Sequence, residues 1–512
     1  MARLATTPRK GPRPLQPRRK PSFVYGMALN EQYAEGKSLR EKYPRRAHGE
    51  WKPRNGRPDP VSLMEQSNKG RQSELVPIRH GRMLKSPFTF YRGAALNMAA
   101  DLASTPATGL RVQACGDAHL SNFGAFATPE RRVIFDINDL DETLPAPWEW
   151  DVKRLAASFV LACRSNGFSE GDARDTVLAC VRSYRERMRE FRKMRVLDVW
   201  YARIDVEEVM GDLADQEGRK RFQKRLAKAR ARSVAEHDFP KLAEVAGQRP
   251  VIKDNPPLIF HWHKEQQAKF FARCQAAFAE YRATLQDDRQ HLLDHYELRD
   301  VAAKVVGVGS VGTWCGILLL LASEQDPLFL QVKEARASVL EAYAGRSIYP
   351  NHGQRVVNGR RLMQSASDLF LGWVKGPDGR HFYIRQLRDM KISVLVEVFN
   401  RTVMTQYAEL TGWALARPRP HRRAREDQRV PRQERPIRRG DRRLRRRLRE
   451  PGGARPQGAH EGRARWPAGS PDFQGRGLAS NPPGDVFEKP QVACFSRITI
   501  ENDLSPRTMR DC

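Results

Sequence analysis

The sequence of 512 residues contains no apolar run long enough to cross a membrane. The longest run, Ile317–Ala322, is far shorter than the roughly 20 residues of a spanning helix and is typical of a buried strand. Seven cysteines form no CxxC pair and no metal-ligand spacing, which argues against a zinc module or a disulfide scaffold. The basic N-terminus lacks the apolar centre of a secretory signal. We therefore expect a soluble protein of the reducing cytoplasm without a membrane partner.

Acidic residues are scarce relative to basic ones. The chain has 60 Asp and Glu against 90 Lys and Arg, which gives a formal net charge of +30. The excess lies mostly at the ends: residues 1–60 carry 15 basic and 5 acidic side chains, and residues 417–512 carry 24 and 12. Such ends favour non-specific contact with nucleic acid.

Composition divides the chain into four parts. Residues 1–74 form a basic, proline-rich arm that we expect to be largely flexible, with order beginning near Leu75. Residues 75–299 contain helical patterns and two strand-like runs, and residues 300–416 contain strands followed by a closing helix. Residues 417–512 are rich in arginine and lose the apolar periodicity that a packed core requires.

Two interpretations of this last part are open from the residues alone. It is a non-globular, nucleic-acid-binding tail, or it is the product of a reading-frame slip near Arg417, because a shifted frame permits a peptide with amphipathic helical periodicity. The nucleotide sequence decides between them. Codons beyond Arg417 that cannot spell an apolar-periodic peptide would exclude the slip.

The first group of residues with catalytic chemistry lies in the strings CGDAHLSN and DINDLDE, each next to a strand-like run. One hairpin-sized unit therefore delivers them together. This density of carboxylates and amides suits a hard, oxygen-seeking ion such as Mg²⁺. Asp and Asn also cap turns, but the joint spacing of the two strings favours a site. The candidate catalytic residues are Asp117 and His119, and the candidate metal ligands are Asn122, Asp136 and Asp139.

A second group begins with the glycine-rich string VGVGSVGT, residues 306–313, between two strand-like runs. A lone glycine string is a weak signal and is often only a tight turn. Here, however, a third strand-like run leads to a lysine, and a helical pattern over residues 336–344 carries a glutamate that we expect to hold it. A glycine loop brings backbone N–H groups close to phosphates, and a lysine neutralises them. The candidate cofactor-binding residues are Gly307, Gly309, Ser310, Gly312, Lys333 and Glu341.

Together these parts resemble the protein-kinase-like superfamily, especially its aminoglycoside-phosphotransferase branch. The resemblance implies that Asp117 is the catalytic Asp and that Asn122 and Asp136 bind Mg²⁺. It also implies that Lys333 and the glycine loop bind the phosphates of ATP, in an α+β, two-lobed protein-kinase-like fold. In ordinary kinases the glycine loop precedes the catalytic loop, whereas here it follows, so such a fold would be circularly permuted.

The chain is also similar to a bacterial family known as domain of unknown function 2252. The resemblance covers about residues 75–416, and many strings occur in the same order. They include SPFTFYRGAA, CGDAHLSNFG, FDINDLDET, WEWDVKRLAASF, KVVGVGSVGT, LFLQVKEA, RLMQSASDLFLGW, YIRQLRDMK and YAELTGWALAR. Family members continue with a helical segment ending in an Asp-His pair, and this chain departs from that pattern at Pro418. The family's name gives no substrate, so the resemblance implies a fold and a phosphate site but no acceptor.

We therefore expect an ATP- and Mg²⁺-dependent phosphotransferase acting on a hydroxyl of an unidentified small molecule or protein. Three alternatives stay open. The same site transfers AMP if ATP binds in reverse, and product mass separates the two reactions. The chain is otherwise a non-catalytic nucleotide-binding protein, or a basic protein that binds nucleic acid through its ends. Salt-dependent DNA binding that disappears with the ends would identify the last case.

Overall fold

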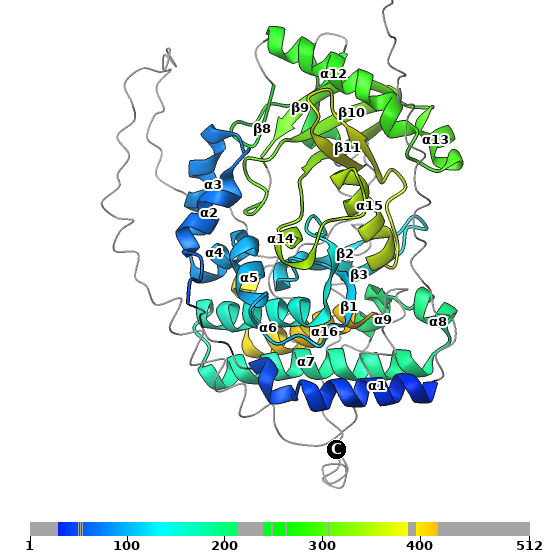
Figure 1. Ribbon diagram of the computed structural model, residues 1–512. Coiled ribbons are helices and arrows are strands. Elements are labelled where there is room, and N and C mark those ends of the chain that lie inside the picture. Colours follow the sequence, from blue (N-terminus) through cyan, green and yellow to red (C-terminus); the bar gives the residue numbers. More distant parts are fainter. Residues whose placement is uncertain are drawn as a thin grey trace, which may run out of the picture.

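The computed structural model describes residues 29–417 except 50, 52, 54, 212–238, 247–248, 262–263, 306 and 388–395. The first 28 residues of the expected arm and the tail after Arg417 lie outside the described residues. The described chain combines α-helices with antiparallel β-sheets, so the expected mixed α+β class is confirmed (Figure 1). Within this part of the chain, no helix is long and apolar enough to cross a membrane.

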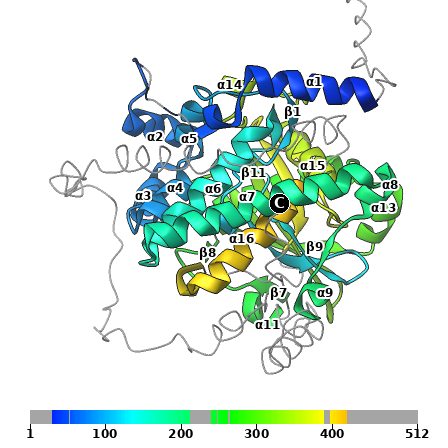
Figure 2. The same ribbon diagram turned by 90° about the horizontal axis from the view of Figure 1, so that it is seen from below.

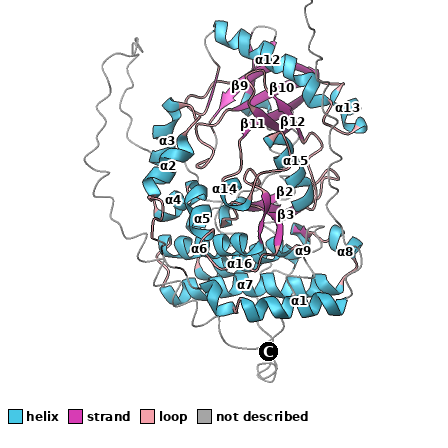
Figure 3. Ribbon diagram, viewed as in Figure 1, coloured by secondary structure: helices cyan, strands magenta, loops and turns pink. Residues whose placement is uncertain are grey.

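The long helices α6, α7 and α16 lie at one end of the molecule, and the long strands β9, β10 and β11 lie at the other end together with α12 (Figure 3). The helices are α1 (Leu29–Lys42), α2 (Pro60–Asn68), α3 (Val76–Met83), α4 (Pro87–Gly93), α5 (Ala95–Leu102), α6 (Trp148–Ser165), α7 (Glu170–Lys193), α8 (Val196–Tyr201), α9 (Val206–Gly211), α11 (Phe239–Leu242), α12 (Lys264–Arg282), α13 (Asp287–Leu293), α14 (Glu341–Ala344), α15 (His352–Met363) and α16 (Arg401–Ala416). The strands are β1 (Arg111–Ala114), β2 (Phe123–Ala127), β3 (Val133–Ile137), β4 (Leu144–Pro147), β5 (Ile204–Asp205), β6 (Ala243–Ala246), β7 (Arg249–Ile252), β8 (Ile259–Phe260), β9 (Glu297–Lys304), β10 (Cys315–Ser323), β11 (Asp326–Ala335), β12 (Gly372–Lys375) and β13 (His381–Gln386).

Helices α6, α7 and α16 pack side by side as the helical layer (Figure 2). Apolar residues at helical spacing place Leu155 and Phe159 of α6 in one core with Tyr407 of α16. Helix α7 begins at a reciprocal capping box between Ser169 and Asp172. Strands β2 and β3 share the core of this layer, and Figure 1 shows them on the side of α6 and α16 that is opposite α7.

A six-stranded antiparallel sheet forms the other end, with the strand order β12-β13-β11-β10-β9-β8. Successive side chains of a strand point to opposite faces. In β10, Leu318 and Leu320 therefore join the core under α12 and α13, while Ile317 and Leu319 join the opposite core. Because both faces are covered, β10 is a continuously apolar run, as its sequence predicts.

Two strand pairs connect these parts. Strand β2 pairs with β3 as a hairpin, and β1 pairs with β4. The first acidic loop (residues 115–122) runs from β1 to β2, and the second acidic loop (residues 138–143) runs from β3 to β4. Both loops thus cross from one strand pair to the other, which brings them together.

Two local expectations differ from the structure. Ordered structure begins before Leu75, because α2 buries Leu63 and Met64. The helical pattern over residues 336–344 yields only the short helix α14. The reason is a long-range contact: the Val339 N–H donates to Glu142 Oε2 at 2.7 Å, which holds the first part of that segment out of a helix. Tertiary contacts override local propensity in this way.

Candidate functional site

Two hydrogen bonds, each accepted by a main-chain carbonyl oxygen, connect the two acidic loops. The Asn138 N–H donates to the Asn122 carbonyl oxygen at 2.7 Å. The Cys115 thiol donates to the Asp139 carbonyl oxygen, with 3.3 Å between sulfur and oxygen. The candidate catalytic and metal-binding side chains therefore lie on two loops that are hydrogen-bonded to each other.

Asp117, the candidate catalytic residue, is held by Arg154 of α6. The Arg154 Nε donates to Asp117 Oδ1 at 2.6 Å, and its guanidinium lies 4.5 Å from the centre of the Tyr91 ring. Burial raises the pKa of Asp117, and the positive charge of Arg154 opposes this rise. Arg154 therefore fixes the orientation of the carboxylate and favours its ionised form.

His119 lies beside this pair but is not its hydrogen-bond partner. Its Nε2 is 3.9 Å from Asp117 Oδ2, and only 3% of the residue is exposed. Burial and the positive charges of Arg154 and Arg92 lower the pKa of His119 well below its usual value. The imidazole is therefore neutral at pH 7, and its Nδ1 has no hydrogen-bond partner among the described residues.

The candidate metal ligand Asp136 is occupied by the protein itself. Its Oδ1 accepts the Ile137 N–H at 2.8 Å, and its Oδ2 accepts both the N–H and the hydroxyl of Ser365, at 2.8 and 2.9 Å. The Arg417 guanidinium lies 3.7 Å from the same oxygen. Asn122, in turn, donates its side-chain N–H to the Asp117 carbonyl oxygen at 2.7 Å. Asp136 thus joins the end of β3 to Ser365, and Asn122 forms a hydrogen bond within the first acidic loop.

The second acidic loop meets the lysine of the large sheet. Lys333 Nζ lies 2.6 Å from Asp141 Oδ2, and the Tyr383 hydroxyl donates to Asp141 Oδ1 at 2.6 Å. Burial by itself would lower the pKa of Lys333, but the charges of Asp139 and Asp141 outweigh it and raise the pKa. Lys333 is therefore ionised at pH 7.

The charge of Asp139 affects both Asp117 and Lys333. Burial opposes its ionisation, but the charges of Lys333 and Arg360 outweigh burial and lower its pKa. Its negative charge also contributes to the raised pKa of Asp117. Asp139 is thus an ionised carboxylate whose charge acts on both the candidate catalytic residue and the candidate phosphate-binding lysine.

The glycine loop joins β9 to β10, as expected, and residues from the N-terminal part of the chain hold it by hydrogen bonds. Gly307 and Gly312 have φ of +73° and +86°, values that residues with a side chain rarely adopt. The Arg82 guanidinium donates to the Gly307 carbonyl oxygen at 2.6 Å, and Arg71 donates to that of Val311 at 2.7 Å. A Cβ on Gly309 would lie 3.3 Å from the Arg92 carbonyl oxygen. Ser310 accepts the Thr313 hydroxyl through its carbonyl oxygen at 2.7 Å.

Glu341 does not take the expected place beside the lysine. It lies on α14, where its Oε1 is 4.0 Å from His352 Nδ1. Asp141, which is 192 residues from Lys333 in the sequence, is the hydrogen-bonded partner instead. The structure therefore unites Lys333 with the acidic loops and leaves Glu341 at a separate position.

Helix α15 holds the second acidic loop against the sheet, and sequence reasoning missed its role. It packs on β11, β12 and β13. On its other side, Arg355 donates to the Thr143 carbonyl oxygen at 2.6 Å, Arg360 to that of Asn138 at 3.0 Å, and Gln364 to that of Ile137 at 2.7 Å. No signal in the sequence identifies this role, because the burial of Arg355 and Arg360 is visible only in the structure.

The donor set decides which kind of metal site is possible here. Within the described residues, no group of three or more His, Cys, Asp or Glu side chains is placed to hold a metal ion. A closed protein cage is therefore not formed. Mg²⁺, however, is usually bound through one or two carboxylates together with water and substrate phosphates. Asp139 and Asp141 of the second acidic loop can supply such carboxylates. Protein donors hold the oxygens of Asp141 (Lys333 and Tyr383) as they hold those of Asp136 (Ile137 and Ser365), so Mg²⁺ at Asp141 would replace the bond to Lys333.

Comparison with known proteins identifies the family. No curated protein and no solved structure matches the chain. The sequence profile of a family described as "Uncharacterized protein conserved in bacteria (DUF2252)" matches residues 71–445. This match covers more than half of the chain, includes every candidate site residue and extends past Arg417. The chain therefore belongs to the bacterial DUF2252 family.

Proposed function

We propose that the chain is an ATP- and Mg²⁺-dependent phosphotransferase that acts on a hydroxyl group of a small molecule or a protein. One observation carries the proposal. Lys333 follows the glycine loop in the sheet, and Asp139 and Asp141 lie in the second acidic loop beside Asp117. A phosphate-binding cation, carboxylates for Mg²⁺ and a candidate base thus occur in one site, as phosphoryl transfer requires.

The proposed roles follow from these positions. Lys333 and the N–H groups of the glycine loop bind the phosphates. Asp139 and Asp141 hold Mg²⁺, which when bound neutralises charge on the phosphates. Asp117, oriented by Arg154, accepts the proton of the acceptor hydroxyl. Positioning and charge neutralisation supply most of the rate in this class of reaction.

The Lys333–Asp141 ion pair has a direct interpretation in this scheme. Each partner neutralises the other when no nucleotide is bound. The phosphates compete for Lys333 and Mg²⁺ competes for Asp141, so nucleotide and metal must enter together. Binding of ATP without Mg²⁺ should accordingly be weak.

We further propose a two-lobed, permuted protein-kinase-like arrangement. In support, the glycine loop joins β9 and β10, Lys333 lies on β11, and a helix, α15, precedes the last two strands of the sheet. Kinases order these small-lobe parts in the same way. The proposed lobe differs from that of kinases in one respect. In kinases a glutamate of this helix pairs with the lysine, whereas α15 carries Arg360 and Lys333 pairs with Asp141 instead.

The test is calorimetric titration of the full-length protein with Mg·ATP. We expect Lys333→Met and Asp139→Asn each to weaken binding at least about tenfold, the loss of roughly one charged hydrogen bond. Lys375→Met, which removes an exposed lysine of the same sheet, serves as the matched control and should leave affinity unchanged. A folded wild-type protein that does not bind Mg·ATP would refute the proposal. Mass analysis of products then distinguishes transfer of phosphate from transfer of AMP.

A further inference from the structure

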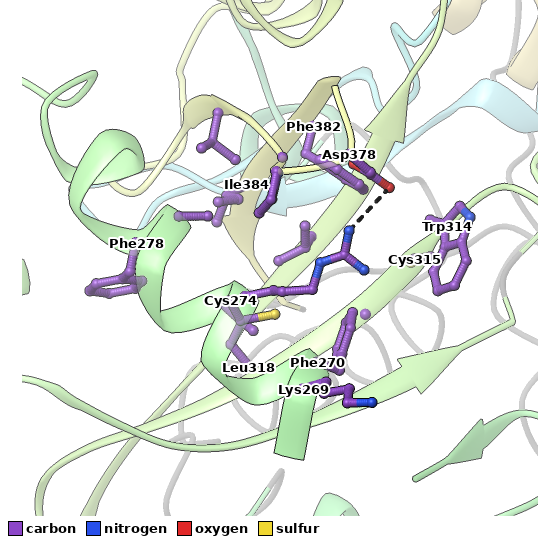
Figure 4. A pocket seen from close by; sticks show the side chains of 17 residues that line it. Lys269, Phe270, Cys274, Phe278, Trp314, Cys315, Leu318, Asp378, Phe382 and Ile384 are labelled. Atoms are coloured by element: carbon purple, nitrogen blue, oxygen red, sulfur yellow. Dashed lines mark ion pairs between the residues drawn. The ribbon is translucent and has the colours of Figure 1, made fainter. Parts of the chain in front are cut away.

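A cavity of about 330 Å³ lies between α12 and the outer face of the large sheet (Figure 4). It is roughly twice as large as the engineered cavity of about 150 Å³ that binds benzene. Natural cores are close-packed, and empty apolar space in them is destabilising. A cavity of this size is therefore a candidate ligand site.

The cavity is separate from the candidate phosphotransfer site. Its walls include Leu318 of β10 and Val332 of β11, whose side chains point to the outer face. Lys333 follows Val332 in the strand and therefore points to the opposite face. Any ligand here would lie behind the strand that carries Lys333, with the sheet between the two sites.

Apolar and aromatic side chains form the walls. Phe270 and Phe278 of α12 and Phe382 and Ile384 of β13 line the cavity (Figure 4). Small residues, among them Ala277, line the same cavity where larger side chains would fill it. The interior therefore suits a flat, apolar body of about two fused rings.

The mouth of the cavity is basic. Lys269 and Arg273 lie on the exposed side of α12. Arg273 is 3.9 Å from Asp378, which is longer than a hydrogen bond, because Asp378 is paired more closely with Arg380 at 3.1 Å. The Arg273 guanidinium thus retains donors. The charged side chains that line the cavity are Lys269, Arg273 and Asp378, which leave its mouth with a net positive charge.

We propose that this cavity binds an apolar carboxylate, with an aromatic body enclosed by the phenylalanines and its carboxylate at Lys269 and Arg273. The site is independent of the proposed phosphotransfer activity. A cationic rim over an apolar interior selects an anion with an apolar body over either a neutral hydrocarbon or a small polar anion.

The experiment is calorimetric titration of the full-length protein with 1-naphthylacetate and with its neutral analogue 1-naphthaleneethanol. We expect saturable binding of the carboxylate and at least about tenfold weaker binding of the alcohol, since a charge-assisted hydrogen bond is lost. The double variant Lys269→Glu, Arg273→Glu should weaken binding of the carboxylate at least about tenfold and leave the alcohol unaffected. Lys193→Glu, an exposed site on α7, is the control and should change neither.

A second pair of variants tests whether the ligand occupies the cavity. Ala277→Trp and Val332→Phe each fill part of the space and should abolish binding of both compounds, and thermal unfolding of each variant reports whether it folds. The proposal is overturned if wild type binds neither compound. It is also overturned if a folded, filled variant binds as wild type does, or if charge reversal leaves the affinity for the carboxylate unchanged.

Discussion

The site is built from buried charges that are stable only in pairs. Arg154 and Lys333 are almost fully buried. Arg154 is paired with Asp117, and Lys333 is paired with Asp141 and is also compensated by the charge of Asp139. Replacing one member of such a pair leaves an uncompensated charge in the interior, which costs far more than the pair itself contributes. Substitutions at these residues should therefore affect stability as well as chemistry.

Arg154→Met should lower the free energy of unfolding by about 3 kcal/mol, the lower end for a broken buried pair, because Asp117, whose side chain is 20% exposed, loses its partner. Adding Asp117→Asn should recover part of that loss, since the remaining group is then neutral. The control is Arg164→Met on the same helix. Arg164 forms a half-exposed pair with Glu170, and its loss should cost less than about 1 kcal/mol. Urea unfolding measures all three, and equal losses for Arg154 and Arg164 would contradict the account.

Lys153, unlike Arg154 and Lys333, is a buried cation that destabilises the fold, and we therefore expect the stability of the protein to depend on pH. Burial lowers its pKa to about 8, while Glu149 raises it only in part, and its Nζ has no hydrogen-bond partner among the described residues. Below pH 8 the lysine is charged in both states, and burying the charge destabilises the fold. Between pH 8 and about 10.4, its unfolded value, the folded state loses the proton first, so stability rises with pH.

Lys153→Met should therefore stabilise the protein at pH 7 by about 2 kcal/mol, less than the full shift implies because the side chain is partly exposed. The gain should shrink above pH 8 and vanish near pH 10.5. Thermal unfolding of wild type and variant across that range is the measurement. A variant that is less stable than wild type at pH 7 would show that Lys153 has a partner that stabilises it.

At the scale of elements, the helical layer depends on a close crossing of α16 and α7. A Cβ on Gly412 would meet the Cys180 carbonyl oxygen, so Gly412→Ala must push the helices apart and should cost about 1–3 kcal/mol. Gly81, in α3, has nothing within 4 Å of its Cβ position. Gly81→Ala should therefore stabilise the protein by about 0.5–1 kcal/mol through helix propensity alone. Thermal unfolding should show a lower stability for Gly412→Ala and a higher stability for Gly81→Ala. A change of the same sign in both variants would contradict the close crossing of α16 and α7.

The end of β3 carries a second element-scale prediction. Asp136→Ala leaves the Ser365 N–H and hydroxyl without their acceptor and should lower stability by about 3 kcal/mol. Measured where the variant is folded, its affinity for Mg·ATP should stay within about threefold of wild type, a small free-energy change. A stable Asp136→Ala variant that has lost Mg·ATP binding would instead make Asp136 the metal ligand, as the family resemblance implies.

Local pattern predicted elements well where the residues themselves determine them. The apolar run Ile317–Ala322 was expected to form a buried strand, and it lies within β10, which spans Cys315–Ser323. The pattern failed over residues 336–344, because Glu142 captures Val339 from far away in the sequence. Contacts of that kind leave no trace in local periodicity.

At the scale of the whole molecule, the sequence indicated the two halves of the candidate site but not how they meet. The acidic strings could be recognised because their residues are neighbours in the chain. The partner of Lys333 could not, because Asp141 lies 192 residues away and the expected partner, Glu341, is closer in sequence. The arginines of α15 join the halves, and nothing in their spacing identifies that role.

The basic ends support a separate prediction about the intact chain. We expect the full-length protein to bind duplex DNA without sequence preference and with a steep decrease in affinity as salt increases. A version lacking residues 1–28 and 418–512 should lose this binding, because residues 417–512 alone carry 24 basic side chains against 12 acidic ones. Fluorescence anisotropy at two salt concentrations tests this, and undiminished binding by the shortened chain would place the DNA site within residues 29–417.

The central claim is that the glycine loop and the acidic loops form one nucleotide site. The most direct measurement is a crystal structure of the protein with Mn²⁺ and a non-hydrolysable ATP analogue, with the metal located by anomalous scattering. We predict a manganese peak at Asp139 and Asp141, and Lys333 bound to a phosphate instead of Asp141. An intact Lys333–Asp141 pair, with the nucleotide bound elsewhere, would contradict the account.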